Sequence, residues 1–253
     1  GAVTFGNGTT GVSGVVSAAN SLVGSNSSSY VGFHGVTALT NGNYVVISAS
    51  WSNGSFFSVG AVTFGDGITG VSGVVSAANS LVGSTGSDNV GLYGVTALAN
   101  GNYVVNSFAW DNGSTANAGA VTFGNGMTGV SGVVSATNSL VGSTANDKVG
   151  EHGITELSTG NYLVRSLAWD NGSETDAGAV TFGNGMTGVS GVVSGVNSLV
   201  GSSDNDKVGE YGITELSTGN YVVRSPFWDN GSEAEAGAVT FGNGTTGVSG
   251  VVS

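Results

Sequence analysis

One 17-residue stretch recurs along the chain at a constant spacing of 59 residues. Its copies begin at Gly1, Gly60, Gly119, Gly178 and Gly237. The last copy, residues 237–253, is identical to residues 1–17. A fixed period of this size is typical of repeat proteins, in which one unit cannot bury its own apolar face. We therefore expect one repeat domain over residues 1–253, with units 1–59, 60–118, 119–177 and 178–236 and a partial unit 237–253.

Composition and charge exclude several classes of protein. Charged residues make up 8% of the chain and apolar residues 39%, so disorder caused by excess charge is not expected. The net charge is −12 with only four Lys and Arg, which argues against a nucleic-acid partner. There is no Cys, and no apolar run reaches the ~18 residues needed to insert into a membrane. The chain opens inside a repeat without a signal peptide, as expected for a mature fragment or a domain of something longer.

The apolar pattern predicts short strands joined by tight turns. Residues 95–98 end at an Asn-Gly turn, residues 103–110 form the longest apolar run, and residues 120–123 follow. A fourth strand is expected within 130–142, with a bend at Asn138. No segment shows apolar spacing of 3.6 residues over three turns, so no helix is expected.

Each unit is thus predicted to be a four-stranded antiparallel meander, and the fold class is all-β. Tandem four-stranded meanders of this length favour a β-propeller with four to five blades. The alternative is a β-solenoid, whose repeats are usually shorter, at ~20–30 residues.

Four short blocks in the repeat carry a resemblance to a known group of proteins. They are residues 101–105 (Gly-Asn-Tyr-Val-Val), 110–113 (Trp-Asp-Asn-Gly), 119–124 (Gly-Ala-Val-Thr-Phe-Gly) and 138–142 (Asn-Ser-Leu-Val-Gly). In these blocks the repeat resembles the propeller-type repeats of very large secreted bacterial surface proteins. The resemblance implies a blade-like fold and an extracellular or cell-surface location, and no defined activity.

The motif G-x-G-x-x-G recurs in every unit, for example at residues 124–129. In nucleotide-binding proteins this motif joins a strand to a helix whose N-terminus receives the phosphates. Here a strand-like Val-Ser-Gly-Val-Val follows, so we interpret the motif as a turn. No set of nucleophile, base and oxyanion donor can be assembled either, and we expect no enzymatic activity.

Aromatic and acidic side chains at repeated positions are the candidates for contacting a ligand. Trp51, Trp110, Trp169 and Trp228 could stack on sugars, although packing between units is the favoured interpretation. Asp111, Asp170 and Asp229 follow three of these Trp residues and begin Asp-Asn-Gly turns. No EF-hand loop is present, and looser calcium binding by loops such as residues 204–206 is left open. No other cofactor is expected.

Seven sequons are permissive for N-glycosylation. They lie at Asn7, Asn26, Asn53, Asn112, Asn171, Asn230 and Asn243. Several coincide with Asn-Gly turns, and turn chemistry alone explains those.

Differences between units are concentrated in two families of loops, which we expect on one face. The first family is residues 26–30, 85–89, 144–148 and 203–207, and the second is 55–59, 114–118, 173–177 and 232–236. This variable face is the expected contact surface, because loops on rigid scaffolds carry function. A turn at Thr159-Gly160 would place Leu157 opposite Tyr162 and pair Glu156 diagonally with Arg165.

The function expected from the sequence is that of a non-enzymatic extracellular structural or adhesive protein. A glycan-binding lectin with one shallow site per blade is the alternative. The chain has five copies of Gly-Ala-Val-Thr-Phe for four hairpins, so one copy is surplus. The surplus strand could lie displaced, begin a half-built blade, or pair with a neighbouring chain and so generate a filament. Self-association or neighbouring repeats are therefore the expected partners.

Overall fold

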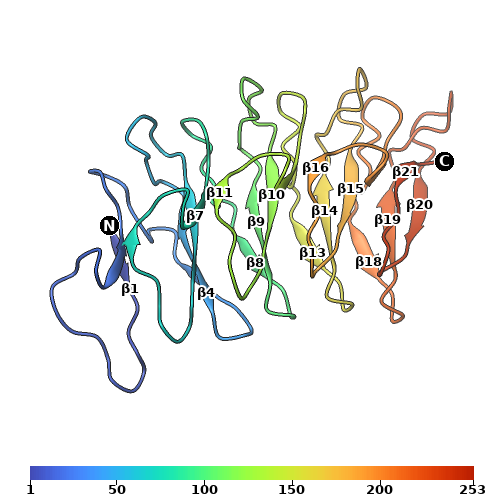
Figure 1. Ribbon diagram of the computed structural model, residues 1–253. Helices are drawn as coiled ribbons and strands as arrows, with labels where there is room; N and C mark the ends of the chain where they lie inside the picture. The colour runs from blue at the N-terminus through green and yellow to red at the C-terminus, as the bar shows by residue number, and fades with distance from the viewer.

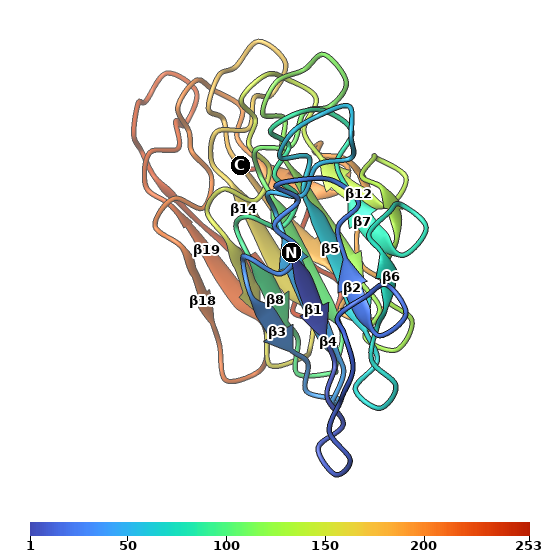
Figure 2. The same ribbon diagram turned by 90° about the vertical axis from the view of Figure 1, so that its left-hand side faces the viewer.

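The computed structural model describes residues 1–253 and contains 21 short strands and no helix. The strands form five sheets that lie side by side in a row, with the two termini at opposite ends (Figure 1). Figure 2 looks along this row from the N-terminal end. The sheets do not close into a ring or barrel. The prediction of an all-β fold without helices is confirmed.

We number the sheets 1 to 5 from the N-terminus. Sheet 1 contains β1 (Ala2–Thr4), β2 (Ser21–Val23) and β6 (Gly73–Val74). Sheet 2 contains β3 (Val36–Ala38), β4 (Tyr44–Ser48), β5 (Ala61–Gly65), β7 (Ser80–Val82) and β11 (Gly132–Val133). Sheet 3 contains β8 (Val95–Ala97), β9 (Tyr103–Ser107), β10 (Ala120–Gly124), β12 (Ser139–Val141) and β16 (Gly191–Val192). Sheet 4 contains β13 (Ile154–Glu156), β14 (Tyr162–Ser166), β15 (Ala179–Gly183), β17 (Ser198–Val200) and β21 (Gly250–Val251). Sheet 5 contains β18 (Ile213–Glu215), β19 (Tyr221–Ser225) and β20 (Ala238–Gly242).

The predicted meander is present, and it is extended by a strand from the next unit. In sheet 3, β8, β9, β10 and β12 pair antiparallel in that order. On the outer side of β12 lies β16, which is parallel to it and comes from the following unit. The same parallel pairing joins sheet 1 to sheet 2, sheet 2 to sheet 3, and sheet 4 to sheet 5. Each full unit after the first therefore contributes strands to three adjacent sheets: unit 60–118, for example, contributes β6 to sheet 1, β5 and β7 to sheet 2, and β8 and β9 to sheet 3.

The single fourth strand expected within residues 130–142 is in fact two strands. β11 pairs with sheet 2, and the chain then returns to sheet 3 as β12. Asn138 makes the return turn, because its Oδ1 accepts the Ser135 N–H at 2.9 Å and its Nδ2 donates to the Val133 carbonyl at 3.0 Å. The expected bend at Asn138 is thus the point where the chain changes sheets.

The predicted hairpin register at Thr159-Gly160 is wrong by one residue. Glu156 lies opposite Tyr162, and the Leu157 N–H donates to the Asn161 carbonyl across a three-residue loop. Gly160, with φ of 80°, supplies the left-handed position that closes such a loop. The second strand is also shorter than expected, since β9 ends at Ser107 and Trp110 lies beyond it.

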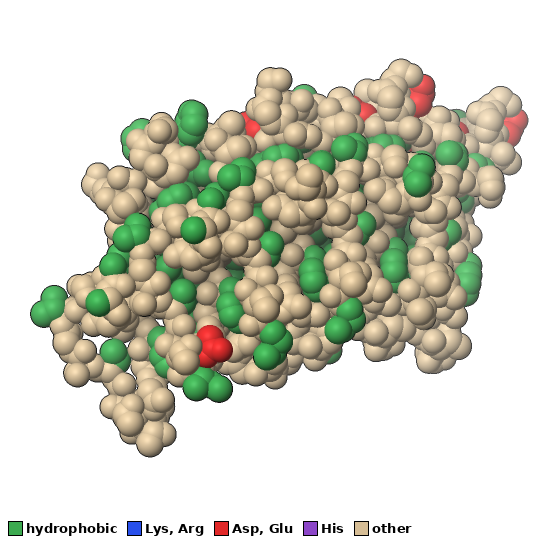
Figure 3. Space-filling view, viewed as in Figure 1, with side chains coloured by type: hydrophobic (Ala, Val, Ile, Leu, Met, Phe, Trp, Pro, Cys, Tyr) green, Lys and Arg blue, Asp and Glu red, His purple; other side chains and the backbone are tan.

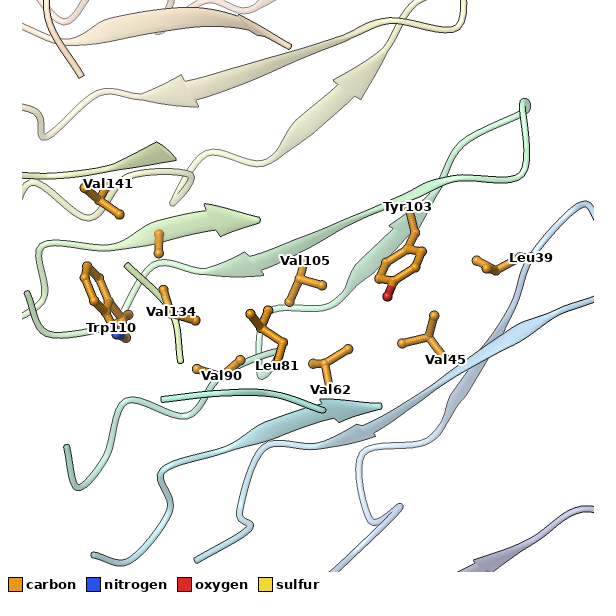
Figure 4. Packing of buried hydrophobic residues seen from close by; sticks show 11 residues of the cluster. Leu39, Val45, Val62, Leu81, Val90, Tyr103, Val105, Trp110, Val134 and Val141 are labelled. Carbon is orange, nitrogen blue, oxygen red and sulfur yellow. The ribbon is translucent and has the colours of Figure 1, made fainter. Parts of the chain in front are cut away.

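The hydrophobic core lies between sheets rather than inside any one of them. A cluster of 11 buried residues between sheets 2 and 3 combines Val45, Val62 and Leu81 with Tyr103 and Trp110 (Figure 4). On β9, Tyr103 and Val105 face sheet 2, whereas Val104 belongs to the cluster on the side of sheet 4. Successive strand residues point to opposite faces, so a strand covered on both sides must be apolar throughout.

Tyrosines at repeated positions belong to these clusters. Tyr103, Tyr162 and Tyr221 are fully buried, and Tyr44 is half-buried. The Tyr103 hydroxyl accepts the Val130 N–H at 3.2 Å. Burial raises the pKa of Tyr103 to about 12, and this hydrogen bond opposes the shift.

A continuous hydrogen-bond ladder of asparagines runs through the row of sheets. In sheet 3, Asn102 Oδ1 accepts the Gly126 N–H at 2.8 Å, and Asn102 Nδ2 donates to the Gly185 carbonyl of sheet 4 at 2.8 Å. Asn43 likewise accepts the Gly67 N–H and donates to the Gly126 carbonyl. Asn161 accepts the Gly185 N–H and donates to the Gly244 carbonyl. Each amide thus satisfies buried backbone groups of two successive sheets, which only a side chain with both a donor and an acceptor can do.

The row ends in partial sheets. Sheet 1 has no counterparts of the first and second strands of a meander, and sheet 5 has no fourth strand. The surplus first copy of the recurring stretch forms β1, which pairs only with β2. Within one chain, this copy thus belongs to a three-stranded terminal sheet.

Replacing Asn102 by Ala should destabilise the row by about 2–4 kcal/mol, because the buried Gly126 N–H loses its acceptor and the Gly185 carbonyl loses one of its two donors, Asn100 Nδ2 being the other. Asn220 is the matched control, since it accepts the Gly244 N–H at 3.0 Å and has no onward acceptor. Urea denaturation should show a loss for Asn220→Ala of about half that size. Equal losses for the two variants would contradict the ladder.

The stability of the fold should fall in alkaline solution between pH 10 and about 12. The folded-state pKa of Tyr103 exceeds the unfolded value of about 10, so its contribution is complete below pH 10 and is lost as the pH rises through 12. Urea midpoints measured across this range should drop together with a rise in tyrosinate absorbance. Tyr103→Phe should reduce the slope; an unchanged slope would contradict the assignment.

Candidate functional site

The two families of variable loops lie on one face of the row, as expected. The Asn146 N–H donates to the Ala116 carbonyl at 2.9 Å, and the Lys148 N–H donates to the Asn117 carbonyl at 3.0 Å. Residues 175–177 and 205–208 are joined in the same way. We call this surface, formed by residues 26–30, 55–59 and their equivalents in later units, the variable face. It lies along the upper side of Figure 1.

A buried aspartate anchors the loops of the variable face in three of the units. Asp147 is fully buried, and its Oδ2 accepts the N–H groups of Ser143 and Thr144 at 2.7 and 2.8 Å. Its Oδ1 accepts the Asp170 N–H at 3.1 Å and so links the loop to sheet 4. Burial raises the pKa of the Asp147 carboxyl, whereas the three N–H donors lower it. Asp88 and Asp206 make equivalent contacts.

The candidate contact residues Asp111, Asp170 and Asp229 stabilise their own loops. Asp170 Oδ1 accepts the Asp176 N–H at 2.9 Å, and Asp111 and Asp229 accept the N–H six residues later at 2.7 Å. In the first unit, Ser52 takes this role and accepts the Ser58 N–H at 3.3 Å. One oxygen of each carboxylate is therefore used within the loop, and the second oxygen of Asp111 also accepts the Thr85 hydroxyl at 3.4 Å. Only the remaining lone pairs can meet a partner.

The four tryptophans are buried, with exposed fractions of 2–9%. Trp110 packs among Val134 and Val141 between sheets (Figure 4), so its ring faces do not reach solvent. The indole N–H groups of all four have no hydrogen-bond acceptor in the chain. Trp51 also lines a surface groove of about 600 Å³ together with Val74, Val133 and Ser84.

The loop proposed for loose calcium binding directs its carboxylates to protein donors. Asp204 Oδ1 accepts the N–H and the hydroxyl of Thr175 at 2.5 and 2.9 Å, and Asp206 is the buried anchor of its unit. No three His, Cys, Asp or Glu side chains lie together in an arrangement that could hold a metal ion. The G-x-G-x-x-G segment 124–129 is a turn, as expected: the Asn125 side chain accepts the Met127 and Thr128 N–H groups.

The seven sequon asparagines fall into two groups by exposure. Five are exposed, and they are Asn7, Asn26, Asn53, Asn230 and Asn243. The other two, Asn112 and Asn171, are half-buried, and the Nδ2 of each donates to a Gly carbonyl, at 3.0 and 2.8 Å. Asn26 Nδ2 likewise donates to the Ser52 carbonyl, at 3.2 Å. Because Nδ2 is the atom that carries an N-linked glycan, Asn7, Asn53, Asn230 and Asn243 are the better suited to modification.

The predicted pair of Glu156 with Arg165 does not form. Glu156 Oε1 accepts the Ala99 N–H of the preceding sheet at 2.6 Å, and Glu215 does the same with Ser158 at 2.7 Å. Arg165 donates to the His152 carbonyl at 2.7 Å. The register shift in the hairpin is the reason, because it moves Glu156 opposite Tyr162. The salt bridge present is Lys148 with Glu151, at 3.4 Å.

Side-chain chemistry on the variable face changes along the row. In the first unit, Phe56 and Phe57 are exposed, and no charged residue lies in 55–59. In the fourth unit, the equivalent residues 232–236 include Glu233 and Glu235, both exposed. Figure 3 shows acidic side chains along the upper side towards the C-terminal end. The face thus offers apolar contacts at one end and acidic contacts at the other.

Two sets of structural residues were not recognised from the sequence. An Asn occupies the position of Asn102 in all four full units, and an Asp occupies the position of Asp147 in three of the four. That recurrence was the available signal, but it does not reveal which backbone groups the side chains reach. The structure contains no helix of the length and apolarity needed to cross a membrane.

Replacing Asp147 by Ala should destabilise the protein by about 2–4 kcal/mol, because three N–H groups lose a buried acceptor. The first unit has Ser29 and Ser52 at the equivalent positions, so Asp147→Ser with Asp170→Ser should be tolerated better than the matching double Ala variant. Thermal and urea denaturation would measure this order. A double Ser variant less stable than the double Ala variant would refute the anchoring role.

Comparison with known proteins adds one finding to this geometry. Among curated proteins, none matches the sequence. A family model described as "Repeat of unknown function (DUF5650)" matches residues 1–33, 38–92, 97–151, 156–210 and 215–253. The inner matches begin 59 residues apart, in agreement with the period of the sequence. The matches cover most of the chain, and the chain therefore belongs to this family of repeats.

Proposed function

We propose that this protein is a non-enzymatic extracellular or cell-surface repeat protein with a structural or adhesive role. The observation that carries the proposal is the linkage between units. Parallel strand pairs, shared cores and the asparagine ladder connect each sheet to the next. A row linked in this way resists bending between units and holds its loops at fixed spacing.

For the architecture, we propose an open solenoid-like array rather than a closed propeller. A ring would require sheet 5 to lie beside sheet 1, whereas the two lie at opposite ends of the row (Figure 1). Pairing between such ends would join chains into filaments.

The variable face is the contact surface in this proposal. Its loops are held by the buried anchors of the Asp147 type, so their sequences can vary while the row stays unchanged. Exposed Phe57 at one end and Glu235 at the other supply different contacts. A partner that spans several units would meet both.

Glycan binding is the second proposal, and the groove beside Trp51 supports it. The buried ring faces oppose it, because sugars stack on an exposed aromatic face. A glycan array of the purified protein with a Trp51→Phe control separates the two proposals. Specific binding that is lost in the variant would favour the lectin.

Antibody labelling of intact source cells tests the location. We expect labelling without permeabilisation, and we expect purified protein to coat a surface and support adhesion. Exchanging residues 55–58 for the residues of 232–235 should change the adhesion partner but leave the denaturation midpoint nearly unchanged, because the buried Val59 is kept. Labelling only after permeabilisation would overturn the extracellular proposal.

A further inference from the structure

The two ends of the row carry complementary surfaces: sheet 5 lacks a fourth strand, and sheet 1 lacks the first two strands of a meander. In sheet 5, Val239 is 71% exposed and Phe241 is 57% exposed. The residues equivalent to Val239 in sheets 3 and 4, Val121 and Val180, are buried. β20 pairs with β19 on one side and has no strand on the other. At the opposite end, β2 already carries a partner of the same sequence as β20, namely β1.

We propose that two copies of this chain join by strand exchange, with residues 237–253 of one copy replacing residues 1–17 of the other. This deepens the proposed function by naming the partner and the contact. The two segments are identical, so β20 can form with β2 of the second copy every backbone pair that β1 forms. The product is a sheet in the order β18-β19-β20-β2-β6, which is the strand arrangement of sheet 2.

The displaced segment is weakly held. Residues 1–17 are exposed except for Val3 and Phe5, which are half-buried. Their main attachments are the three residue pairs of β1 with β2 and the Thr4–Ser21 hydroxyl contact of 2.7 Å. Exchange regains both, and Val239 and Phe241 take the places that Val3 and Phe5 leave. The net gain comes from β18 and β19, which complete the sheet that faces sheet 2 of the second copy, where β1 had no such neighbours. The balance therefore favours exchange once two copies meet.

Side chains at the end of sheet 5 match specific positions in the second copy. Within the chain, Phe5 stacks on Tyr44 and lies against Gly70, where any Cβ would clash with its ring. Phe182 lies against Gly247 in the same way. After exchange, Phe241 takes the place of Phe5 against Gly70 and Tyr44 of the second copy.

The polar ladder continues across the same junction. Asn220 accepts the Gly244 N–H and has no further carbonyl to which its Nδ2 can donate. Gly67 is bonded to Asn43 through its N–H and has no preceding asparagine for its carbonyl. After exchange, the Gly67 carbonyl of the second copy lies beside Asn220 as the Gly244 carbonyl lies beside Asn161. Asn220 Nδ2 can then donate to this carbonyl, and the ladder becomes continuous.

A surface hollow at the end of sheet 5 fits the loop that follows β2. It measures about 330 Å³ and is lined by residues that include Tyr211, Arg224, Pro226 and Val239. One unit earlier, Gly209 lies over Val180, and Arg165 donates to the Gly209 carbonyl at 3.4 Å. Gly32 of the second copy would occupy this position over Val239, with Arg224 as its donor.

Exchange of this kind does not close on itself. Each copy offers residues 237–253 at one end and β2 at the other, so the contact is heterologous and repeats into a filament. Further units in a longer chain would occupy these surfaces in cis, and the test therefore uses the 253-residue chain.

Engineered cysteines give a direct test, because the chain has none of its own. In Thr240→Cys with Ser21→Cys, the two positions lie at opposite ends of one chain (Figure 1) but face each other after exchange. Mild oxidation should give a ladder of intermolecular disulfides. In the control Thr4→Cys with Ser21→Cys, oxidation should tie down residues 1–17 and lower the assembled fraction at least tenfold, with recovery on reduction.

A second pair of variants guards against misfolding of the first. Phe241→Asp should reduce assembly at least tenfold in light-scattering chromatography, whereas Phe5→Asp should leave it unchanged or increased. A wild-type protein that stays monomeric at millimolar concentration would overturn the exchange, as would equal effects of the two Asp variants. Cell-surface labelling does not depend on exchange, so the proposed structural role is judged separately.

Discussion

The structure depends on the burial of each sheet's faces by its neighbours. A meander of three- and five-residue strands has two apolar faces and no second layer within its own unit. The Val45, Leu81 and Trp110 cluster is therefore shared between two sheets, and so are the other clusters. A unit removed from the row would expose both faces of Tyr-Val-Val strands to water. Stability is then a property of the junctions between units rather than of the units themselves.

Stacking sheets face to face creates a problem for the polar backbone at the turns. The turn glycines are packed so closely that a Cβ on Gly126 would lie 1.7 Å from the Gly101 carbonyl oxygen of its own sheet and 3.0 Å from the Asn41 amide nitrogen of the preceding sheet. Water has little room there, so the amide of Asn102 supplies both the donor and the acceptor that the two turns need. The close packing and the asparagine ladder are consequences of the same stacking.

On the opposite face, the loops are stabilised by carboxylates buried at their base. Asp147 accepts three N–H groups, so the backbone of these loops is fixed from its base. That anchoring explains how residues 55–59 can be aromatic while residues 232–236 are acidic on the same backbone. The candidate contact residue Asp170 belongs to the network, so variation at the loop tips is the better guide to a partner.

The sequence by itself determined the period, the all-β class, the absence of helices and the four antiparallel strands of each meander, because these follow from local alternation and turn residues. It also identified the variable face, since loop families at fixed offsets in a meander must emerge together. Only the tertiary structure decided that residues 130–142 divide between two sheets. That division depends on Asn138 and on a strand from the adjacent unit, neither of which local patterns describe. The Glu156 contact with Ala99, the partners of Asn102 and the burial of Asp147 were likewise set by neighbouring sheets. Side chains of one unit reach backbone groups 57 to 83 residues away, and no rule based on nearby residues predicts such partners.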